Sequence, residues 1–417
     1  MAKAIVVGGG IIGLSSAYYL HQSGWEVTIL DKGDFTNNCS YGNAGYVCPS
    51  HFVPLAAPGI VGQGLRWMLD AESPFYIKPR IDKGLLHWGM KFMRSATQQN
   101  VERNAVPLRD IALLSKQLYE QWLQNPGFDF GYQQKGLLEY FQTAEKEKHA
   151  RHTVEAATAL GLEARLLTAQ EVQAMEPKVD IVLRGALYFG CDAHVQPNLV
   201  MEQLQRYLKN AEVRFVPNSE VQGFEKAGNR IGKVRTANEY YDADAVVIAT
   251  GSWSRQVVQT LGVQLPLVGG RGYSMLFSDG ELPLNHPAVL MEGRVALTPF
   301  NATTTRLGGT MEITSLNAPP NMKRVAGIIK AARAFYPEAD LRMPELKDVW
   351  YGYRPCSADG MPFIGRVNSW RNCIVATGHA MVGMSLGPAT GKLASELVNE
   401  QATSVDLHPY RLERFGG

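Results

Sequence analysis

The 417-residue chain lacks the long apolar runs, the paired cysteines and the excess of one charge that mark three large classes of protein. No apolar stretch reaches the roughly 18 residues that a membrane-spanning helix needs, which argues against an integral membrane protein. Lys and Arg (41) nearly balance Asp and Glu (39), so the net charge of +2 predicts no nucleic-acid partner. Only five cysteines occur, an odd number without a C-x-x-C pair, which favours reduced thiols in a cytoplasmic protein. They are Cys39, Cys48, Cys191, Cys356 and Cys373.

Signatures of metal binding and of export are also missing. The nine histidines form no H-E-x-x-H motif, and Cys191-x-x-His194 has no second pair of ligands in view, so we expect no metal site. The first apolar segment is a glycine motif and not a signal peptide. What the chain does have is 45% hydrophobic residues, over a length that suits two domains with a sizeable core.

The most informative motif lies at residues 4–14, which predict a buried strand, a glycine turn and the start of a helix. The spacing Gly8-x-Gly10-x-x-Gly13 is typical of dinucleotide-binding turns, whose glycines permit a tight turn, close approach to a pyrophosphate and close helix packing. A second apolar run, residues 27–30, ends in Asp31, an acid suited to accept hydrogen bonds from ribose hydroxyls. The pattern predicts a dinucleotide at the N-terminus of this helix, where N–H groups and the helix dipole favour an anion.

Two later apolar runs, residues 245–249 and 373–376, both end in Ala-Thr-Gly. The second is followed by an expected helix at residues 386–398. Glycine at the end of a buried strand is typical of places where backbone approaches a ligand closely, although a three-residue string also recurs by chance. We therefore expect two further contacts between the backbone and the dinucleotide.

The segments between these blocks have a different pattern, which predicts a second domain. We expect helices at residues 106–123, 145–161 and 325–335, an antiparallel meander at 213–234, and strands within 267–307. Residues 1–48, 190–264 and 352–417 then form a discontinuous nucleotide-binding domain, and residues 49–189 and 265–351 form a substrate-binding domain. A site is expected where the two domains meet.

Four blocks of sequence together resemble one family of flavoenzymes. They are the first glycine motif with Asp31, Ser40-x-x-Asn43-Ala44-Gly45, residues 271–274 (RGYS), and residues 352–365 (GYRPCSADGMPFIG) followed by 376–379 (ATGH). Over nearly its full length the chain resembles the flavin-dependent D-amino acid oxidase and glycine oxidase superfamily, in particular the bacterial D-amino acid dehydrogenases. The resemblance implies an α/β protein with a Rossmann-like, glutathione-reductase-like FAD-binding domain and an inserted α+β substrate domain built on a mostly antiparallel sheet.

The resemblance also implies that the dinucleotide is FAD and not NAD. The ADP half is expected on the first turn, the loop of residues 43–45 near the pyrophosphate and the flavin ring, and the Gly378-His379 turn facing the ring. We expect the FAD to be non-covalent, because no family-like cysteine or histidine tether is present apart from the candidate Cys356. The residues expected to bind FAD are Gly8, Gly10, Ile12, Gly13, Asp31, Lys32, Ser40, Asn43, Ala44, Gly45, Val221, Thr250, Gly251, Trp253, Gly352, Arg354, Gly378, His379, Gly383 and Met384.

Three residues are expected to act on the substrate. The resemblance implies that Arg354 pairs with a substrate carboxylate, a contact that suits the guanidinium fork; from composition alone, an arginine before proline also fits a structural salt bridge. Tyr273 would offer its hydroxyl to the carboxylate or amine, with a half-buried strand tyrosine as the alternative. His379 would touch flavin or substrate through its ring or its backbone N–H. Residues 380–383 (AMVG) replace a second arginine of glycine oxidase, which predicts an apolar wall and disfavours glycine as substrate.

The implied reaction is oxidation of the Cα–N bond of a D-amino acid, or of a cyclic imino acid such as D-proline or hydroxyproline. Hydride would pass from Cα to flavin N5, giving a 2-oxo acid plus ammonia, or a cyclic imine. Electrons would then pass to a quinone or another acceptor that is not oxygen. The alternatives are a glycine or sarcosine oxidase that uses oxygen, an NAD-dependent dehydrogenase, and a flavoprotein without catalytic activity.

Residues 84–96 (GLLHWGMKFMRSA) and 65–69 (LRWML) combine aromatic, apolar and cationic side chains. Such segments fit an ordinary core. They also fit a peripheral contact with the inner face of the plasma membrane, in which Trp88 and Phe92 enter the headgroup boundary while Lys91 and Arg94 meet anionic lipid. A quinone acceptor would require such a contact.

Overall fold

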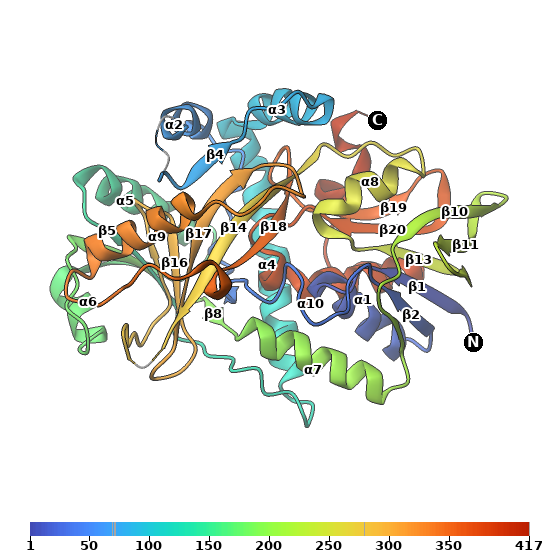
Figure 1. Ribbon diagram of the computed structural model, residues 1–417, viewed down its shortest axis with the longest axis horizontal. Coiled ribbons are helices and arrows are strands. Elements are labelled where there is room, and N and C mark those ends of the chain that lie inside the picture. The colour runs from blue at the N-terminus through green and yellow to red at the C-terminus, as the bar shows by residue number, and fades with distance from the viewer. Residues whose placement is uncertain (69, 71, 279, 417) are drawn as a thin grey trace.

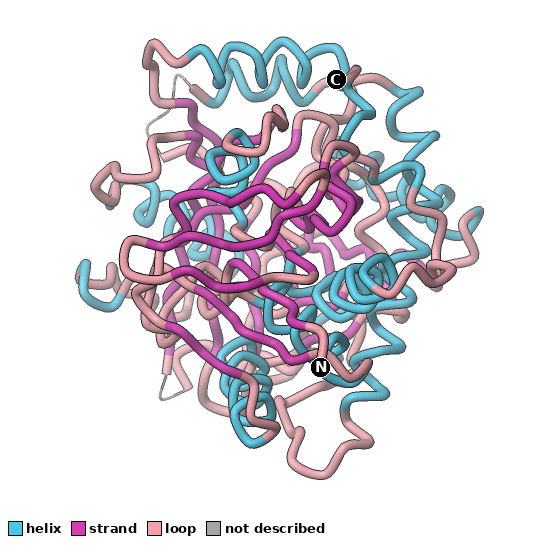
Figure 2. The backbone as a smooth tube through the Cα atoms, turned by 90° about the vertical axis from the view of Figure 1, so that its right-hand side faces the viewer, coloured by secondary structure: helices cyan, strands magenta, loops and turns pink. Residues whose placement is uncertain are grey.

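The computed structural model describes residues 1–68, 70, 72–278 and 280–416, and it contains two large sheets set side by side (Figure 1). The sheet on the right of Figure 1 has six strands, and the sheet on the left has nine. Figure 2 views the molecule from the right-hand side of Figure 1, with strands in front and the C-terminus at the top. None of the described helices is both long enough and apolar enough to cross a bilayer.

The six-stranded sheet, in the order β19-β20-β13-β1-β2-β9, is built on a parallel core. β1 pairs in parallel with β2 and β13, β13 pairs in parallel with β20, and β19 is an antiparallel edge. Their continuous apolar runs are typical of strands covered on both faces. The strands are β1 (Lys3–Val7), β2 (Glu26–Leu30), β9 (Arg214–Val216), β13 (Ala245–Ile248), β19 (Phe363–Val367) and β20 (Trp370–Thr377).

Helices α1 (Ile11–Gln22) and α10 (Gly383–Val398) pack against each other at very short range. A Cβ atom at Gly391 would lie 2.4 Å from the backbone of Ser15, so only glycine permits this contact. Helix α4 (Gln98–Trp122) shares a buried apolar cluster with α10 through Leu108, Ile111 and Leu393. The remaining helices near this sheet are α7 (Pro197–Asn210), α8 (Ser254–Gln259) and the short η1 (Gly251–Trp253).

The nine-stranded sheet has the order β18-β14-β17-β16-β15-β5-β7-β6, with β4 beside β17. It is mostly antiparallel, and among the strands that the structure describes only the β15–β5 and β17–β4 pairs are parallel. Helix α9 (Met322–Phe335) packs on one face through a core that includes Ile328 and Phe335. The strands are β4 (Phe75–Ile77), β5 (Leu137–Phe141), β6 (Ala164–Thr168), β7 (Gly185–Phe189), β14 (Leu267–Phe277), β15 (Ala288–Leu290), β16 (Val295–Pro299), β17 (Thr305–Ile313) and β18 (Trp350–Ser357). Further helices are α2 (Ile60–Trp67), α3 (Lys83–Ser95), α5 (Ala144–Ala159), α6 (Ala169–Met175) and η2 (Leu346–Asp348).

One expected element is wrong in part. The alternating segment at residues 213–234 is not a single meander, because β9 at its start joins the parallel sheet beside β2. The antiparallel three-stranded sheet instead consists of β10 (Val221–Ala227), β11 (Arg230–Thr236) and β12 (Tyr240–Asp242), and β3 (Tyr46–Val47) pairs with β8 (Ala193–His194). Alternation of apolar and polar residues is the same in both settings, so it does not identify the partner strand. The boundary proposed at residue 352 falls within β18, which pairs with β14.

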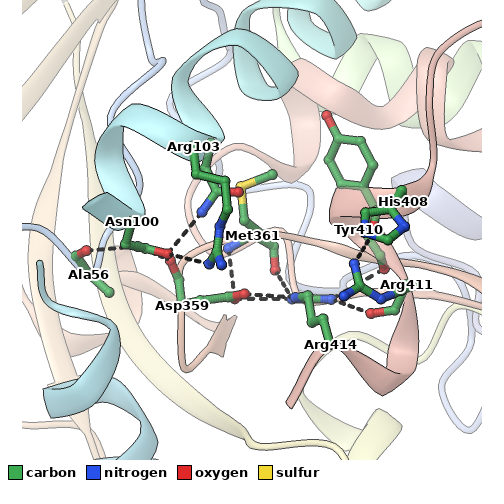
Figure 3. A network of polar contacts seen from close by, with 10 residues as sticks. Ala56, Asn100, Arg103, Asp359, Met361, His408, Tyr410, Arg411 and Arg414 are labelled. Carbon is green, nitrogen blue, oxygen red and sulfur yellow. Dashed lines mark hydrogen bonds and ion pairs between the residues drawn. The ribbon is translucent and has the colours of Figure 1, made fainter. Parts of the chain in front are cut away.

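A buried ion pair fastens the C-terminal segment to the body of the protein (Figure 3). Arg414 donates from Nε and Nη2 to the Asp359 carboxylate at 2.7 and 3.0 Å, and it also donates to the carbonyl oxygen of Met361. Asn100 of α4 donates to the carbonyl oxygens of Ala56 and Asp359. The network joins the C-terminal turns η3 (His408–Tyr410) and η4 (Leu412–Phe415) to α4 and to the segment at residues 52–57.

Candidate functional site

A cavity of about 1,820 Å³ lies between the two sheets and collects most of the residues that the sequence singled out. Pockets for one small ligand are typically about 300–1,000 Å³, so this cavity has room for a dinucleotide and a second molecule. Gly13, Gly45 and Gly378 lie behind the lining; a Cβ atom at Gly13 would lie 1.8 Å from the carbonyl oxygen of Gly8. The predicted residues that line the cavity are Gly8, Gly10, Ile12, Asp31, Lys32, Ser40, Asn43, Ala44, Val221, Thr250, Gly251, Trp253, Tyr273, Gly352, Arg354, His379, Gly383 and Met384.

The first glycine turn presents the N-terminus of α1 to the cavity. Gly8 has φ +108, in the region that favours glycine, and no side chain caps the helix at Gly10. Ile11 donates its N–H to Ser40 Oγ at 3.0 Å, which ties the turn to the following loop. Asp31 accepts from the N–H of Gly9 at 2.5 Å, so its carboxylate supports the turn. A helix N-terminus whose N-cap residue is a glycine without a side chain, beside two further glycines, fits a pyrophosphate.

Beyond the glycine turn, the cavity wall carries an aromatic side chain and a cation. Lys32 Nζ lies 3.5 Å from the ring centroid of Trp253, and burial lowers the pKa of this lysine. Val221 and Thr250 complete this part of the lining. A flat apolar ring with a neighbouring cation fits the adenine end of a dinucleotide.

The loop of residues 41–45 forms the next part of the wall, and the nine-stranded sheet holds it from behind. Ser274 donates to the carbonyl oxygen of Gly42 at 2.9 Å, and Thr298 donates to that of Ala44 at 2.7 Å. Asn43 donates to the carbonyl oxygen of Met381 at 3.4 Å, in the turn that precedes α10. Sequence reasoning found the loop and included Ser274 in the block of residues 271–274, without a role, but it missed Thr298, because a single threonine in a strand carries no motif of its own.

Arg354 lies on β18 with its guanidinium over Gly272 of the neighbouring strand, where a Cβ atom would lie 2.0 Å from Nη1. It donates to the carbonyl oxygen of Thr310 and forms no ion pair with any described residue. Burial lowers the pKa of the guanidinium. The salt-bridge alternative is therefore not what the structure shows, and the remaining N–H groups are available to a carboxylate in the cavity.

The carbonyl that binds Arg354 belongs to a strained residue. Thr310 has φ +67, which a β-branched residue rarely adopts, and it lies at a bulge in β17 opposite Arg271 and Tyr273. Backbone strain of this kind is found at functional sites. Nothing in the local sequence pointed to Thr310, because glycine is the residue that usually marks such a bulge.

The Tyr273 hydroxyl has two hydrogen-bond partners within the protein. The hydroxyl donates to Glu312 Oε2 at 2.9 Å and accepts from the N–H of Asn321 at 2.8 Å, and the side chain is fully buried. Arg271 binds the same Glu312 oxygen through Nε and Nη2. Tyr273 thus joins a buried ion pair at the cavity wall, and the action of its hydroxyl on a substrate stays a prediction.

His379 lines the cavity, and its ring is buried and hydrogen-bonded to α10. Its Nε2 lies 2.9 Å from Thr390 Oγ1 of α10, and burial lowers its pKa to about 3. The imidazole is therefore neutral at physiological pH. The residue after it, Ala380, has φ +45, and the turn leads into α10, which starts without a side-chain cap.

The membrane-facing assignment within α3 also needs correction. Trp88 is buried, donates from Nε1 to the carbonyl oxygen of Cys356 at 3.0 Å and stacks on Phe92, so it cannot reach lipid. The other side of α3 is exposed instead, at Leu86, Met90 and Met93. Leu65 of α2 is also exposed, whereas Leu69, named with it, lies outside the described residues.

The family described as DAO, FAD dependent oxidoreductase, matches residues 3–397 of the chain. A D-amino acid dehydrogenase of Helicobacter pylori is 32% identical over 403 residues, which cover 96% of this chain and 95% of the relative. A D-amino acid dehydrogenase of Vibrio vulnificus strain YJ016 is 29% identical over 421 residues, which cover 98% and 99% of the two chains.

Solved structures share the fold. Glycine oxidase from Geobacillus kaustophilus is similar with a TM-score of 0.79 at 22% identity, covering 100% of this chain and 99% of the other. L-proline dehydrogenase from P. horikoshii is similar with a TM-score of 0.73 at 19% identity, covering 99% and 97%. The predicted α/β fold class is confirmed by these likenesses.

Proposed function

The chain belongs to the DAO family of FAD-dependent oxidoreductases, and from this premise we propose that it is a dehydrogenase of D-amino acids or cyclic imino acids. The observation that carries the proposal is Arg354, a half-buried guanidinium that lines the same cavity as the dinucleotide turn and has no acidic partner among the described residues. Relatives of nearly equal length bear the name D-amino acid dehydrogenase.

The cavity fits FAD. The first glycine turn and Asp31 would hold the ADP half, with Lys32 and Trp253 at the adenine, and the 41–45 loop and the start of α10 would hold the other half. When bound, FAD supplies the acceptor, at N5, for a hydride from the substrate Cα.

We propose that FAD is held without a covalent bond, because Cys356 is fully buried and its pKa is raised to about 12. Acid precipitation should release all the yellow colour; colour kept in the pellet would contradict this.

Arg354 would fix the substrate carboxylate by two parallel hydrogen bonds and so orient Cα. No side-chain base is required when the amine binds in its neutral form, and neither the neutral His379 nor the hydrogen-bonded Tyr273 supplies one. The imine product then hydrolyses to a 2-oxo acid and ammonia, or remains a cyclic imine. Catalysis on this scheme is mainly orientation.

Residues 381 and 382 support a substrate larger than glycine. Met381 and Val382 line the cavity in the turn before α10, next to His379. An apolar wall there favours a substrate with an apolar side chain or ring, because burial of such a group stabilises the complex.

We also propose a non-oxygen acceptor such as a membrane quinone. Helices α2 and α3, which carry the exposed apolar residues Leu65, Leu86, Met90 and Met93, lie along the top of Figure 1. Leu65 and Met93 also line the cavity. Arg66, Lys83 and Arg94 are exposed on the same helices or beside them. This combination of apolar and cationic side chains fits the surface of an anionic membrane.

An anaerobic screen of D-, L- and imino acids, followed by bleaching of the flavin band, tests the proposed substrate class. D-amino or cyclic imino acids should reduce the flavin, and L-amino acids should not. Turnover of the same substrate with oxygen, compared with a quinone analogue, then tests the acceptor. Equal rates with oxygen and with the quinone analogue would instead support an oxidase of the glycine or sarcosine type.

A further inference from the structure

Arg306 carries a buried positive charge that no described acidic side chain neutralises. It lies in β17 behind the 41–45 loop, is 8% exposed and forms no ion pair within the described part of the chain. Its Nη1 donates to the carbonyl oxygens of Tyr41 and Asn43 at 2.9 and 2.7 Å, and the guanidinium lies 4.7 Å from the ring centroid of Phe300. Burial lowers its pKa to about 10. A desolvated charge without a counter-ion is costly, so its retention needs a reason.

Arg306 binds the peptide groups that join Tyr41 to Gly42 and Asn43 to Ala44, and the N–H groups of these two peptides have no acceptor among the described residues. A trans peptide directs its N–H opposite to its C=O, and none of the described peptide bonds is cis. The bonds to the Tyr41 and Asn43 carbonyls therefore direct the N–H groups of Gly42 and Ala44 away from Arg306. Neither N–H has an acceptor among the described residues. Because Gly42 and Ala44 line the cavity, the loop presents two backbone donors to it.

The loop lies between the two helix N-termini that border the cavity. Ser40 accepts from the N–H of Ile11 at the start of α1, and Asn43 donates to Met381 just before α10. A ligand that extends from one helix to the other therefore passes the two donors. We propose that Arg306 polarises the two peptide groups so that the N–H groups of Gly42 and Ala44 bind reduced FAD more tightly than oxidised FAD, and so raise its reduction potential.

This proposal rests on the FAD dependence of the proposed function, and it makes no assumption about the substrate. Reduction adds negative charge to the cofactor, and preorganised donors next to a buried cation stabilise that charge most. A purely structural role would be to hold the loop in place. Ser274 and Thr298 also hold it, but they are neutral, and they bind the carbonyls of Gly42 and Ala44. The two roles are thus separable by substitution.

The test is the midpoint potential of bound FAD, measured against reference dyes during chemical reduction without any amino acid. Arg306→Gln should raise the ratio of the dissociation constants for reduced and oxidised FAD about tenfold, which lowers the potential by about 30 mV for a two-electron couple. Arg306→Lys, which keeps the charge, should remain near the wild-type potential. Ser274→Ala and Thr298→Val should weaken FAD binding of both redox states alike and leave the potential unchanged.

The matched control is Arg324→Gln, which removes another buried guanidinium bound to a backbone carbonyl, that of Ser73, far along the chain from the loop. Its potential should equal that of the wild type. A wild-type potential in Arg306→Gln, or an equal drop in Arg324→Gln or Thr298→Val, would overturn the proposal. If Arg306→Gln does not retain FAD, the result for Arg306→Lys is used instead. FAD bound at the wild-type potential supports the role of the charge, and loss of FAD or a potential about 30 mV below that of the wild type refutes it. Because no substrate is used, failure here leaves the proposed substrate class untouched.

Discussion

Two buried arginines, Arg271 and Arg306, and the half-buried Arg354 differ in what accompanies their charge. Arg271 is paired with Glu312, Arg306 binds only carbonyl oxygens of the 41–45 loop, and Arg354 binds the carbonyl oxygen of Thr310. Only Arg354 also lines the cavity. A carboxylate that reaches Arg354 in the cavity therefore finds a guanidinium with unused donors and no acidic side chain paired with it among the described residues.

Replacing Arg354 should separate binding of FAD from binding of substrate. Arg354→Ala is expected to keep the fold and the FAD but to lose about a hundredfold in kcat/KM, since a charge-assisted bidentate contact contributes on the order of 3 kcal/mol. Arg354→Lys should recover only part of this, because an ammonium cannot reproduce the fork. Dye-coupled anaerobic kinetics and the flavin spectrum provide the two measurements. Wild-type turnover in the alanine variant would show that Arg354 does not bind the substrate.

Thr310 should be a site where stability and function conflict. Thr310→Gly relieves the strain of φ +67 and is expected to raise the free energy of unfolding by about 1 kcal/mol, even though glycine costs entropy elsewhere. Thr305→Gly, in the same strand but without positive φ, should lower it by about 1 kcal/mol or more. Denaturant unfolding of both variants measures this. A Thr310→Gly protein that is less stable than the wild type would show that the bulge is not strained.

Helix α3 presents different apolar surfaces to protein and to solvent. Leu85, Trp88 and Phe92 contact the buried cluster beneath the helix, whereas Met90 and Met93 face outward. An amphipathic helix normally buries its apolar side and exposes a polar one. The outward apolar side of α3 is consequently the feature that a partner surface would cover.

The triple variant Leu86→Ser, Met90→Ser and Met93→Ser should bind anionic vesicles at least about tenfold more weakly, because each buried apolar side chain contributes about 1.5 kcal/mol or more. Salt should weaken binding of the wild type further. Co-sedimentation with vesicles is the measurement, and Leu113→Ser with Leu346→Ser, two exposed leucines elsewhere, is the control. Equal binding by the triple variant and the wild type would place the membrane contact elsewhere or exclude it.

The protein as a whole should be sensitive to acid because His194 and His379 are buried as neutral rings. His194 of β8 is fully inaccessible, and burial lowers its pKa to about 4; the pKa of His379 is lowered to about 3. An unfolded histidine has a pKa of about 6.5. Between these values the unfolded chain binds more protons than the folded one, so the free energy of unfolding falls as the pH falls.

Thermal unfolding between pH 7 and pH 4 measures this dependence. The wild type should be fully stabilised above about pH 6.5 and lose stability progressively below it. His194→Leu should flatten part of the curve, and His152→Leu, on the exposed surface of α5, should not. A His194→Leu curve parallel to that of the wild type would exclude His194 as a source of the acid sensitivity.

The amino-acid sequence by itself determined the dinucleotide turn, the strand ends near Thr250 and Thr377, and the place of Arg354 in a recognisable block. These features depend on local conformation: glycine at positive φ, continuous apolar runs and short spacings. Only the tertiary structure decided that the Tyr273 hydroxyl binds Glu312, that Trp88 is buried, and that β9 joins the parallel sheet. It also decided the contact of Arg306 with Tyr41, 265 residues earlier in the chain. A side chain's partner at such separation is set by how sheets and loops pack, and no local pattern encodes it.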